Sequence, residues 1–391
     1  MALTFSTAGE SHGPGVIASV FGFPFGHELD TDWINAQLKR RQGGYGRGGR
    51  QNLERDEVTV LSGVRKGVTI GSPLTLVVYN KDSRLDKAPD LPNVRPGHVD
   101  LAGVLKIGSR NARDVLERAS ARETAARVMV GSVCQSLLRE FGIEIVAHVL
   151  SIGDVQADAP MGKGYSQIFR NAGAARSARD AADFGTIERD HDAALTTAID
   201  AAKAEGDTLG GSIEVVALNL PPGLGSHNQS DTRLDGRIGQ ALMSIQAMKA
   251  VEIGLGAECA KRRGSKVHDP VLPMAPAAGR SPYARGGNNA GGLEGGVTNG
   301  EPLVCRVHMK PISTLMNPLD TVDVSTGKAA KASTERSDTC AVPAAAIVAE
   351  CAVAIVIAQA LLEKTGGDSV LEQQRNLEGY LASLKPFGEG A

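Results

Sequence analysis

The stretch 341–362 is the most apolar part of the chain, and it strongly limits the folds available. A membrane-spanning helix needs about 20 apolar residues with few polar interruptions. This stretch contains Pro343, Glu350 and Gln359. Proline suits the first position of a helix, and the glycine pair 366–367 is a typical helix end. We therefore predict a long helix that begins at Pro343 and lies in a protein core, and no association with a membrane.

The rest of the chain mixes helical segments and short β runs in no regular order. Helical signals mark 30–38, 188–204 and 231–248, and a helix begins at Ser120, where Ser120 and Glu123 fit a capping box. Six stretches read as strands: 15–21, 58–61, 74–79, 143–152, 212–220 and 303–308.

This irregular order favours an α+β layered fold. A doubly wound nucleotide-binding fold would alternate strands and helices regularly and show an early G-x-G-x-x-G motif, and the sequence has neither. No Pro/Ser tract or block of charge divides the chain, so we expect a single domain over residues 1–391.

The charged residues nearly balance, with 42 Lys and Arg against 44 Asp and Glu, a net charge of −2. Aromatic residues make up only 4% of the chain. Proteins that bind nucleic acids carry basic surfaces, and those that stack on bases need aromatic side chains. We therefore expect no nucleic-acid partner.

The five cysteines form no C-x-x-C pair, and four of them stand among apolar or small residues. This pattern indicates buried thiols in a reducing compartment and neither disulfides nor a structural metal site. The first residues include no basic segment and no long apolar run, which a secretory signal would need. The expected location is the cytoplasm.

Two short segments place a histidine beside glycines. Ser11 and His12 lie within Gly9–Gly13, and in the segment 95–100 the turn at Pro96 and Gly97 presents His98 between Arg95 and Asp100. Adjacent Ser and His side chains do not easily form a nucleophile–base pair, so we do not expect a hydrolase. Each segment alone is more typical of a polar loop than of a catalytic site.

A basic, glycine-rich run covers residues 39–50, with five cations and no acid between Asp32 and Glu54. One interpretation is a solvated helix end followed by a flexible loop. The other is an anion site, in which glycines let the backbone approach while arginines grip carboxylate or phosphate. In the second case Gly46→Val would stiffen a closing loop and leave the fold intact.

Three further segments suit an anionic or planar ligand. Residues 117–124 place Ser120 and two arginines at a helix start, which is a typical anion site. Residues 288–300 are rich in glycine and precede the hydroxyl-bearing segment 310–314, and residues 336–340 precede the apolar helix. Taken singly, each is also compatible with a helix cap, a surface loop or a helix entry.

In this order, the six segments resemble the chorismate synthase family. The matching motifs are G-E-S-H-G at 9–13, R-R-Q-G-G-Y-G-R-G-G-R at 40–50, R-P-G-H at 95–98, E-R-A-S-A-R-E-T at 117–124, K-P-I-S-T at 310–314 and R-S-D at 336–338. The glycine pairs 286–287, 291–292 and 295–296 match as well. The sequence departs from the family at 105–111, at Val99 and at Thr339, and the segment 80–95 is short.

The resemblance implies a β-α-β sandwich with helices between antiparallel sheets, and a homotetramer. It implies a 1,4-anti elimination of phosphate from 5-enolpyruvylshikimate 3-phosphate that gives chorismate, the last step of the shikimate pathway. That reaction requires reduced FMN (FMNH2) without net redox change. The substrate is a small phosphorylated molecule.

The resemblance also assigns residues to roles. His12, His98 and Asp338 would be catalytic. The FMN site would comprise Arg118, Ala119, Ser120, Gln246, Ala247, Gly295, Lys310, Pro311, Ile312, Ser313, Thr314 and Arg336. Substrate or NADPH would be bound by Ser11, Arg41, Arg47, Arg95 and Arg122.

Three alternatives stay open. The chain could be a phosphate- or flavin-binding module without catalysis, although His12, His98 and Asp338 speak against that. A nucleic-acid-binding protein would use residues 39–50, against the low aromatic content. A bifunctional enzyme would also reduce its own FMN with NADPH, and because the chain has no obvious extra domain we favour the monofunctional form.

Overall fold

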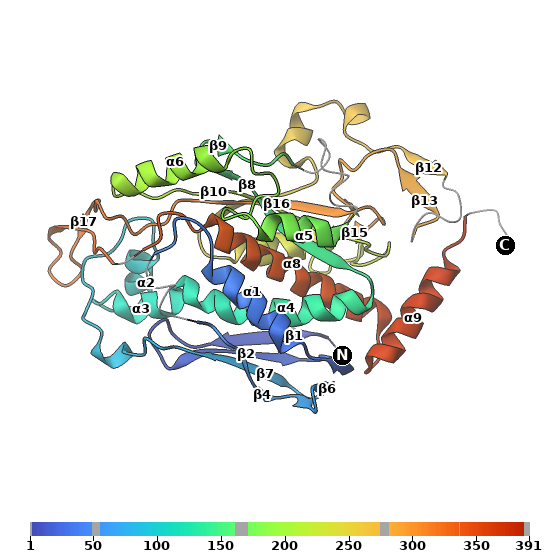
Figure 1. Ribbon diagram of the computed structural model, residues 1–391, viewed down its shortest axis with the longest axis horizontal. Coiled ribbons are helices and arrows are strands. Elements are labelled where there is room, and N and C mark those ends of the chain that lie inside the picture. Colours follow the sequence, from blue (N-terminus) through green and yellow to red (C-terminus); the bar gives the residue numbers. More distant parts are fainter. Residues whose placement is uncertain (1, 49–54, 161–170, 274–280, 336, 387–391) are drawn as a thin grey trace.

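The computed structural model describes residues 2–48, 55–160, 171–273, 281–335 and 337–386. Two larger antiparallel sheets dominate it (Figure 1). The first has the order β1 (Thr4–Ala8), β2 (Gly15–Phe21), β7 (Leu74–Tyr79), β4 (Thr59–Ser62). The second has the order β11 (Met248–Ile253), β16 (Leu303–Met309), β10 (Gly211–Leu218), β8 (Glu144–Ile152), β9 (Val155–Gln156).

The remaining strands form smaller sheets. They are β3 (Phe25–Glu28) with β6 (Val68–Ile70) and β5 (Val64–Arg65), and the hairpins β12 (Val271–Pro273)–β13 (Tyr283–Arg285), β14 (Leu293–Glu294)–β15 (Val297–Thr298) and β17 (Asp320–Val322)–β18 (Ala329–Lys331).

The helices of the described residues are α1 (Thr31–Gln42), α2 (Asp100–Ile107), α3 (Arg113–Ala119), α4 (Thr124–Glu140), α5 (Ala172–Asp180), α6 (Asp192–Ala204), α7 (Leu234–Met243), α8 (Val342–Thr365) and α9 (Val370–Ser383). Four short 3₁₀ turns, η2 (Leu85–Lys87), η3 (Ala121–Glu123), η5 (Gly256–Lys261) and η6 (Gly264–Lys266), complete the elements. The predicted α+β class is confirmed.

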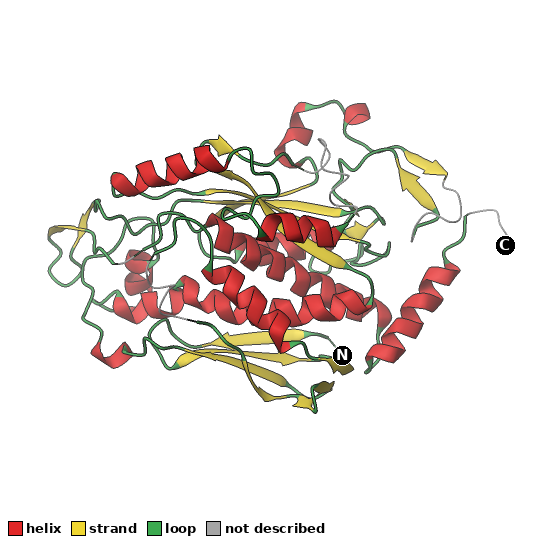
Figure 2. Ribbon diagram, in the orientation of Figure 1, coloured by secondary structure: helices red, strands yellow, loops and turns green. Residues whose placement is uncertain are grey.

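Helix α8 is the predicted apolar helix, with proline in its first turn. Its length and hydropathy would suffice to cross a membrane, but 94% of its most apolar window is buried inside the molecule. It contacts α4 on one side and strands β8 and β10 on the other, while α4 contacts β2 and β7. Figure 2 shows α1, α4 and α8 between the two larger sheets.

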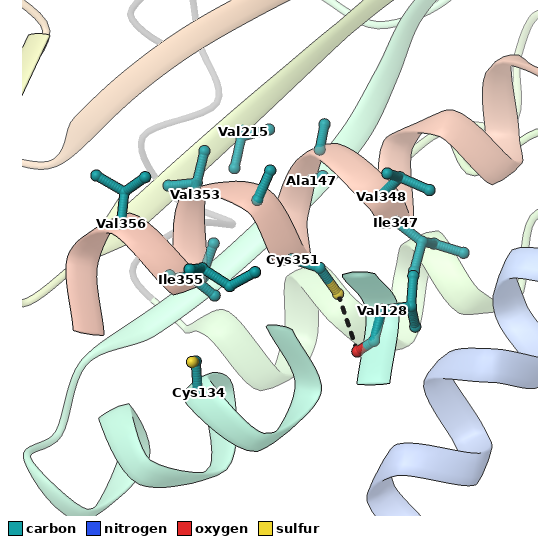
Figure 3. Packing of buried hydrophobic residues seen from close by; sticks show 14 of the residues in the cluster. Val128, Cys134, Ala147, Val215, Ile347, Val348, Cys351, Val353, Ile355 and Val356 are labelled. Carbon is teal, nitrogen blue, oxygen red and sulfur yellow. Dashed lines mark hydrogen bonds between the residues drawn. The ribbon is translucent and has the colours of Figure 1, made fainter. Parts of the chain in front are cut away.

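Helices α4 and α8 come into close contact where Gly131 faces Cys351. A Cβ built on Gly131 would lie 2.2 Å from the Cβ of Cys351, so only glycine allows the two backbones this approach. The Cys351 thiol faces the Val128 carbonyl at 3.8 Å (Figure 3). Four of the five cysteines are buried, as the sequence predicts, and Cys259 is exposed.

Several predicted boundaries need correction. The predicted helix 231–248 is only α7, because Ala247 adopts a left-handed backbone (φ 68°) and Met248 already begins β11. The predicted helix 188–204 begins at Asp192.

The predicted capping box at Ser120 is half right. The Ser120 hydroxyl accepts from the backbone N–H of Arg122 and caps the turn η3, and α4 itself begins at Thr124. The Glu123 carboxylate does not close the box but binds Arg127 and Thr7.

The buried acid of α8, Glu350, lies in a network of opposite charges. Its carboxylate is fully buried and accepts hydrogen bonds from Gln135 (2.8 Å), the backbone N–H of Ala147 (2.7 Å) and Arg179 (2.5 Å). Arg40 lies 3.5 Å away, and Asp180 balances both arginines. Burial alone would raise the pKa of Glu350, but Arg179 and Arg40 outweigh it and lower that pKa to about 2.

We predict that Glu350→Gln destabilises the protein by about 3–5 kcal/mol at pH 7, because it leaves two buried arginines short of one negative charge. The folded pKa is lowered, so this contribution is complete above the unfolded value of 4.5 and disappears as the pH falls towards 2. Urea unfolding of both proteins at several pH values measures it. The exposed Glu363, paired with Arg237, is the control, and Glu363→Gln should cost less than about 1 kcal/mol. An equal loss for both variants would contradict the prediction.

Candidate functional site

The turn between β1 and β2 carries Ser11 and His12, and both are buried. Gly9 begins the turn with φ 106°, where a Cβ would lie 2.2 Å from the Gly15 carbonyl oxygen. His12 Nδ1 lies 2.9 and 3.0 Å from the two carboxylate oxygens of Glu117, and its backbone N–H donates to the same carboxylate. On the other side of the ring, Nε2 lies 3.8 Å from Asp82.

Glu117 belongs to α3 and is itself buried. Arg113, one helical turn earlier, donates to Glu117 at 3.1 Å and to Glu335 at 2.9 Å. Burial would raise the pKa of Glu117, but the hydrogen bonds and charges of His12 and Arg113 outweigh it and lower that pKa.

A second histidine lies in the segment 95–100, before α2. Arg95 donates to the buried Asp100 through Nε (2.8 Å) and Nη2 (3.0 Å), and Nη1 reaches the Thr314 hydroxyl at 3.1 Å. His98 Nδ1 makes a hydrogen bond to Asp100. Burial would raise the pKa of Asp100, but His98 and Arg95 lower it well below its usual range.

Two of the predicted anion-binding arginines share one buried acid. Asp56 accepts from Arg41 Nη2 at 2.7 Å and from Arg122 Nη1 at 2.7 Å. Burial would raise the pKa of Asp56, but the two guanidiniums lower it. Among the described residues, Arg41 Nε and Arg122 Nη2 are buried without a hydrogen-bond partner. These two N–H groups are therefore available to an anionic ligand.

The side chain of Asn80, at the end of β7, joins the His12 turn to this arginine pair. Its amide nitrogen donates to the carbonyls of Glu10 (3.1 Å), Ser11 (3.3 Å) and Gly13 (2.8 Å). Its oxygen accepts from Arg122 Nε at 2.8 Å. One amide thus fixes the histidine turn relative to Arg122.

The basic run packs against the segment before α8. Arg47 forms an ion pair with Asp338 at 2.6 Å, and the Gly48 N–H donates to the same carboxylate at 2.7 Å. Tyr45 donates to Asp200 at 2.9 Å, and Gly46 accepts from the backbone of Thr339. The interpretation of a solvated flexible loop is therefore wrong for residues 45–48, and residues 49–50 lie outside the described part.

Most residues predicted to hold a cofactor lie along one connected path. Arg118 donates to Thr7, which donates to Glu123, and Gln246 donates to Glu123 at 3.4 Å. The next residue, Ala247, accepts from the backbone N–H of Lys310. Ala119 and Ser120 directly follow Arg118 at the end of α3.

The segment 310–314 continues this path towards the second histidine. Lys310 donates to Ser313 at 2.9 Å, Ile312 accepts from Thr208, and a Cβ on Gly97 would lie 3.8 Å from the Ser313 hydroxyl. Burial and the nearby Lys249 ammonium lower the pKa of Lys310. The intervening Pro311 carbonyl lies 3.3 Å from the Lys310 ammonium.

Gly295 lies apart from this path within the chain. Its neighbour Gly296 accepts from Leu234 at the start of α7, whereas Gln246 follows the end of that helix. Helix α7 has ten residues and is therefore about 15 Å long, so Gly296 at its start lies about that far from the end that precedes Gln246. Arg336 lies outside the described residues. Within the described residues, no group of three or more His, Cys, Asp or Glu side chains could hold a metal ion.

The sequence assigns no role to four residues of the site: Asp56, Asn80, Asp100 and Glu117. Asp100 and Glu117 lie within or beside the predicted motifs, so their proximity was a usable signal. Asp56 and Asn80 act through contacts 66 and 42 residues away along the chain, both to Arg122, and no local pattern indicates them.

The site thus combines buried arginines that retain free donors with two histidines, each hydrogen-bonded to a carboxylate. Such a set can bind phosphate or carboxylate groups and exchange a proton with the bound ligand. The fold and the site define an α+β enzyme for an acidic small molecule.

Comparison with known proteins identifies the family. The family model described as chorismate synthase matches residues 3–362. A relative named chorismate synthase from Trichlorobacter lovleyi is 50% identical, over 98% of this chain and 100% of its own length. Another of that name from Aquifex aeolicus is 49% identical, over 98% of this chain and 99% of its own length. A crystal structure of chorismate synthase superposes with a TM-score of 0.81 at 43% identity, covering 99% of both chains. The chain belongs to the chorismate synthase family, the carbon–oxygen lyases of the shikimate pathway to aromatic amino acids.

The surroundings of Gly46 change the expectation for its replacement. Gly46 has φ 85°, and a Cβ there would lie 3.0 Å from Ile199 Cγ2 and 3.1 Å from Cys340 Cβ. Gly46→Val should therefore destabilise the protein by about 2–4 kcal/mol, through backbone strain and overpacking, rather than leave the fold intact.

The control is Gly67, which has φ 81° and where a Cβ would meet no atom of the described residues within 4 Å. Gly67→Val should carry only the backbone strain, about 1–2 kcal/mol. Urea unfolding of both variants measures the difference. Equal losses would show that the contacts to Ile199 and Cys340 do not restrict the loop.

Proposed function

We propose that this chain releases phosphate from 5-enolpyruvylshikimate 3-phosphate to form chorismate, with reduced FMN as cofactor. The observation that carries the proposal is the set of buried donors Arg41 Nε, Arg47 Nε and Arg122 Nη2, which have no partner among the described residues. They belong to segments that Asp56, Asp338 and Asn80 hold in place. A substrate with one phosphate and two carboxylates needs such a set of cations.

The residues present fit a flavin. The side-chain oxygen of Gln246 is buried and has no partner among the described residues. The Lys310 ammonium and the Ser313 hydroxyl offer donors for a phosphate group, and Arg118 and Ser120 flank the same path. These residues, with Ala119, Ala247 and 311–314, would hold the cofactor. When bound, reduced FMN would supply electron density to the substrate as its allylic phosphate leaves, without net redox change.

The chain's own residues would bind, orient and manage protons. Arg41, Arg47 and Arg122 would hold the anionic groups of the substrate, while Ser11 and Arg95 would complete the pocket. His12 would present Nε2 as an acid, and His98 would do so on the side of Thr314. Asp338, fixed by Arg47 and the Gly48 N–H, would take up the proton that the substrate loses.

The assignment of Arg41 and Arg47 favours the substrate over NADPH. Both side chains are largely buried and each is paired with a carboxylate, which suits a small, tightly enclosed anion. The proposal is therefore a monofunctional enzyme, to which reduced flavin is supplied by another source.

The proposal includes the family's layered sandwich as a single domain over 1–391, a homotetramer and a cytoplasmic location. The contacts of α4 with β2 and β7, and of α8 with β8 and β10, support the layers. Ile17, Phe21 and Tyr79 are exposed and alternate with core residues on β2 and β7, so they face away from α4. An apolar outer sheet face of this kind supports contact with a second copy.

The test is anaerobic incubation with the enolpyruvyl substrate and chemically reduced FMN, followed by the absorbance of chorismate. We expect product only with reduced FMN. A second reaction with NADPH and oxidised FMN should give none. Phosphate release at the same rate without flavin would refute the cofactor, and product with NADPH would show the bifunctional form.

We predict that Arg47→Ala lowers kcat/KM about 10- to 150-fold, because a charge-assisted contact is worth about 1.5–3 kcal/mol. Arg47→Lys should recover little of the lost kcat/KM, since a lysine ammonium is a single point charge and lacks the planar guanidinium that binds an anion through two N–H groups. Steady-state kinetics with reduced FMN, beside the melting temperature, measure this. Arg189→Ala is the control, because Arg189 is exposed and binds Asp192 and the Ala181 carbonyl, neither of which belongs to the site. Unchanged kinetics for Arg47→Ala would remove Arg47 from the substrate site.

A further inference from the structure

Glu117 holds residues 11 and 12 through three separate contacts. Its backbone carbonyl accepts from the Ser11 N–H at 2.9 Å, and its carboxylate accepts from the His12 N–H at 2.9 Å. The same carboxylate lies within 3.0 Å of His12 Nδ1 through both oxygens. The residue therefore fixes the peptide and the imidazole ring of His12 together.

The groups around His12 form a line of alternating charge. Glu335 binds Arg113, Arg113 binds Glu117, and Glu117 binds His12. On the far side of the ring, Asp82 lies 3.8 Å from Nε2 and is itself paired with Arg84 at 3.0 Å. The backbone carbonyl of His12 accepts from the N–H groups of Arg84 and Leu85.

A carboxylate can only accept hydrogen bonds, so the His12 nitrogen that faces Glu117 must carry a proton. In the neutral ring this fixes the Nδ1–H tautomer and leaves Nε2 unprotonated. In the charged ring both nitrogens carry protons, and the one on Nε2 is free to leave. A carboxylate that orients a catalytic imidazole in this way is a recurrent device in enzymes.

We propose that Glu117 is the positioning residue of His12: it holds the proton on Nδ1, so that Nε2 is the atom that exchanges a proton with the bound anion. The identity of that anion rests on the proposed function. The orientation of the ring does not, because the contacts to Glu117 that set it lie within the chain itself.

Glu117→Met tests the proposal, because methionine has a similar length and no strong acceptor. In ligand-free protein labelled with ¹⁵N-histidine, the His12 signal is assigned by its loss in His12→Gln. We expect the neutral ring of the unsubstituted protein to be the Nδ1–H tautomer, and the ring in Glu117→Met to be mainly Nε2–H, facing Asp82. A His12 tautomer unchanged in Glu117→Met would overturn the proposal.

The kinetic arm separates positioning from a structural role. With reduced FMN, Glu117→Met should lower kcat about 100-fold or more, with KM changed less than about threefold, since proton transfer and not binding is affected. Asp114→Asn is the matched control on the same helix, since the Asp114 carboxylate accepts a hydrogen bond from the nearby Ser109 hydroxyl and does not contact His12 in the described part of the chain. The proposal would be overturned if the kcat of Glu117→Met lay within twofold of that of the unsubstituted protein, or if the substitution raised KM and left kcat unchanged.

Glu117→Gln covers the case in which the Met variant does not fold. It keeps the volume and one acceptor but removes the charge, and it should lower kcat at least tenfold with KM nearly unchanged. A kcat equal to that of the unsubstituted protein would overturn the proposal. If the unsubstituted protein forms no chorismate at all, the proposed function fails, while the tautomer measurement still decides whether Glu117 fixes the ring.

Discussion

The close contact between α4 and α8 at Gly131 and Cys351 determines how the rest of the site is assembled. Both helices begin at site segments: Arg122 lies just before α4, and Asp338 lies just before α8. The contact lies about two turns from the first helical residue of α4 and about two and a half turns from that of α8. Because the helices are held backbone to backbone there, the spacing of their first turns is set in the core. The basic run 39–50 packs against the first turn of α8, since a Cβ on Gly44 would lie 2.8 Å from Pro343 Cβ.

Buried charge imposes a second constraint. A guanidinium removed from water is tolerated only where an acid and further hydrogen bonds compensate it. Asp56 compensates Arg41 and Arg122, Asp338 compensates Arg47, and Asp100 compensates Arg95. These pairings hold each side chain in one orientation, and among the described residues Arg41, Arg47 and Arg122 each keep one buried N–H group without a partner. Because the arginines are oriented before the ligand arrives, little side-chain entropy remains to be lost on binding.

The sequence predicts the elements whose pattern is local and strong. The run 341–362 is apolar enough to indicate α8 directly, and strands 15–21 and 74–79 coincide with β2 and β7. The prediction of a helix over 231–248 fails because α7 ends at Met243, and the left-handed backbone of Ala247 (φ 68°) directly precedes β11. The motif histidines and arginines are visible in the sequence because of their glycine and proline neighbours. Asp100 lies beside its motif, two residues from His98, but the pairing of Glu117 with His12 spans 105 residues and no local pattern indicates it.

The two histidines share one arrangement that the sequence does not reveal. His12 Nδ1 faces the buried Glu117, and His98 Nδ1 faces the buried Asp100. Each carboxylate is held in turn by an arginine, Arg113 or Arg95. In both cases the acid keeps a proton on Nδ1, so Nε2 is the nitrogen left to face a ligand. Each acid stays charged, because its histidine and its arginine together lower the pKa of the carboxyl group against the effect of burial. The same physical solution therefore occurs twice, at two turns that are remote in sequence and joined by the shared core of α2 and α3.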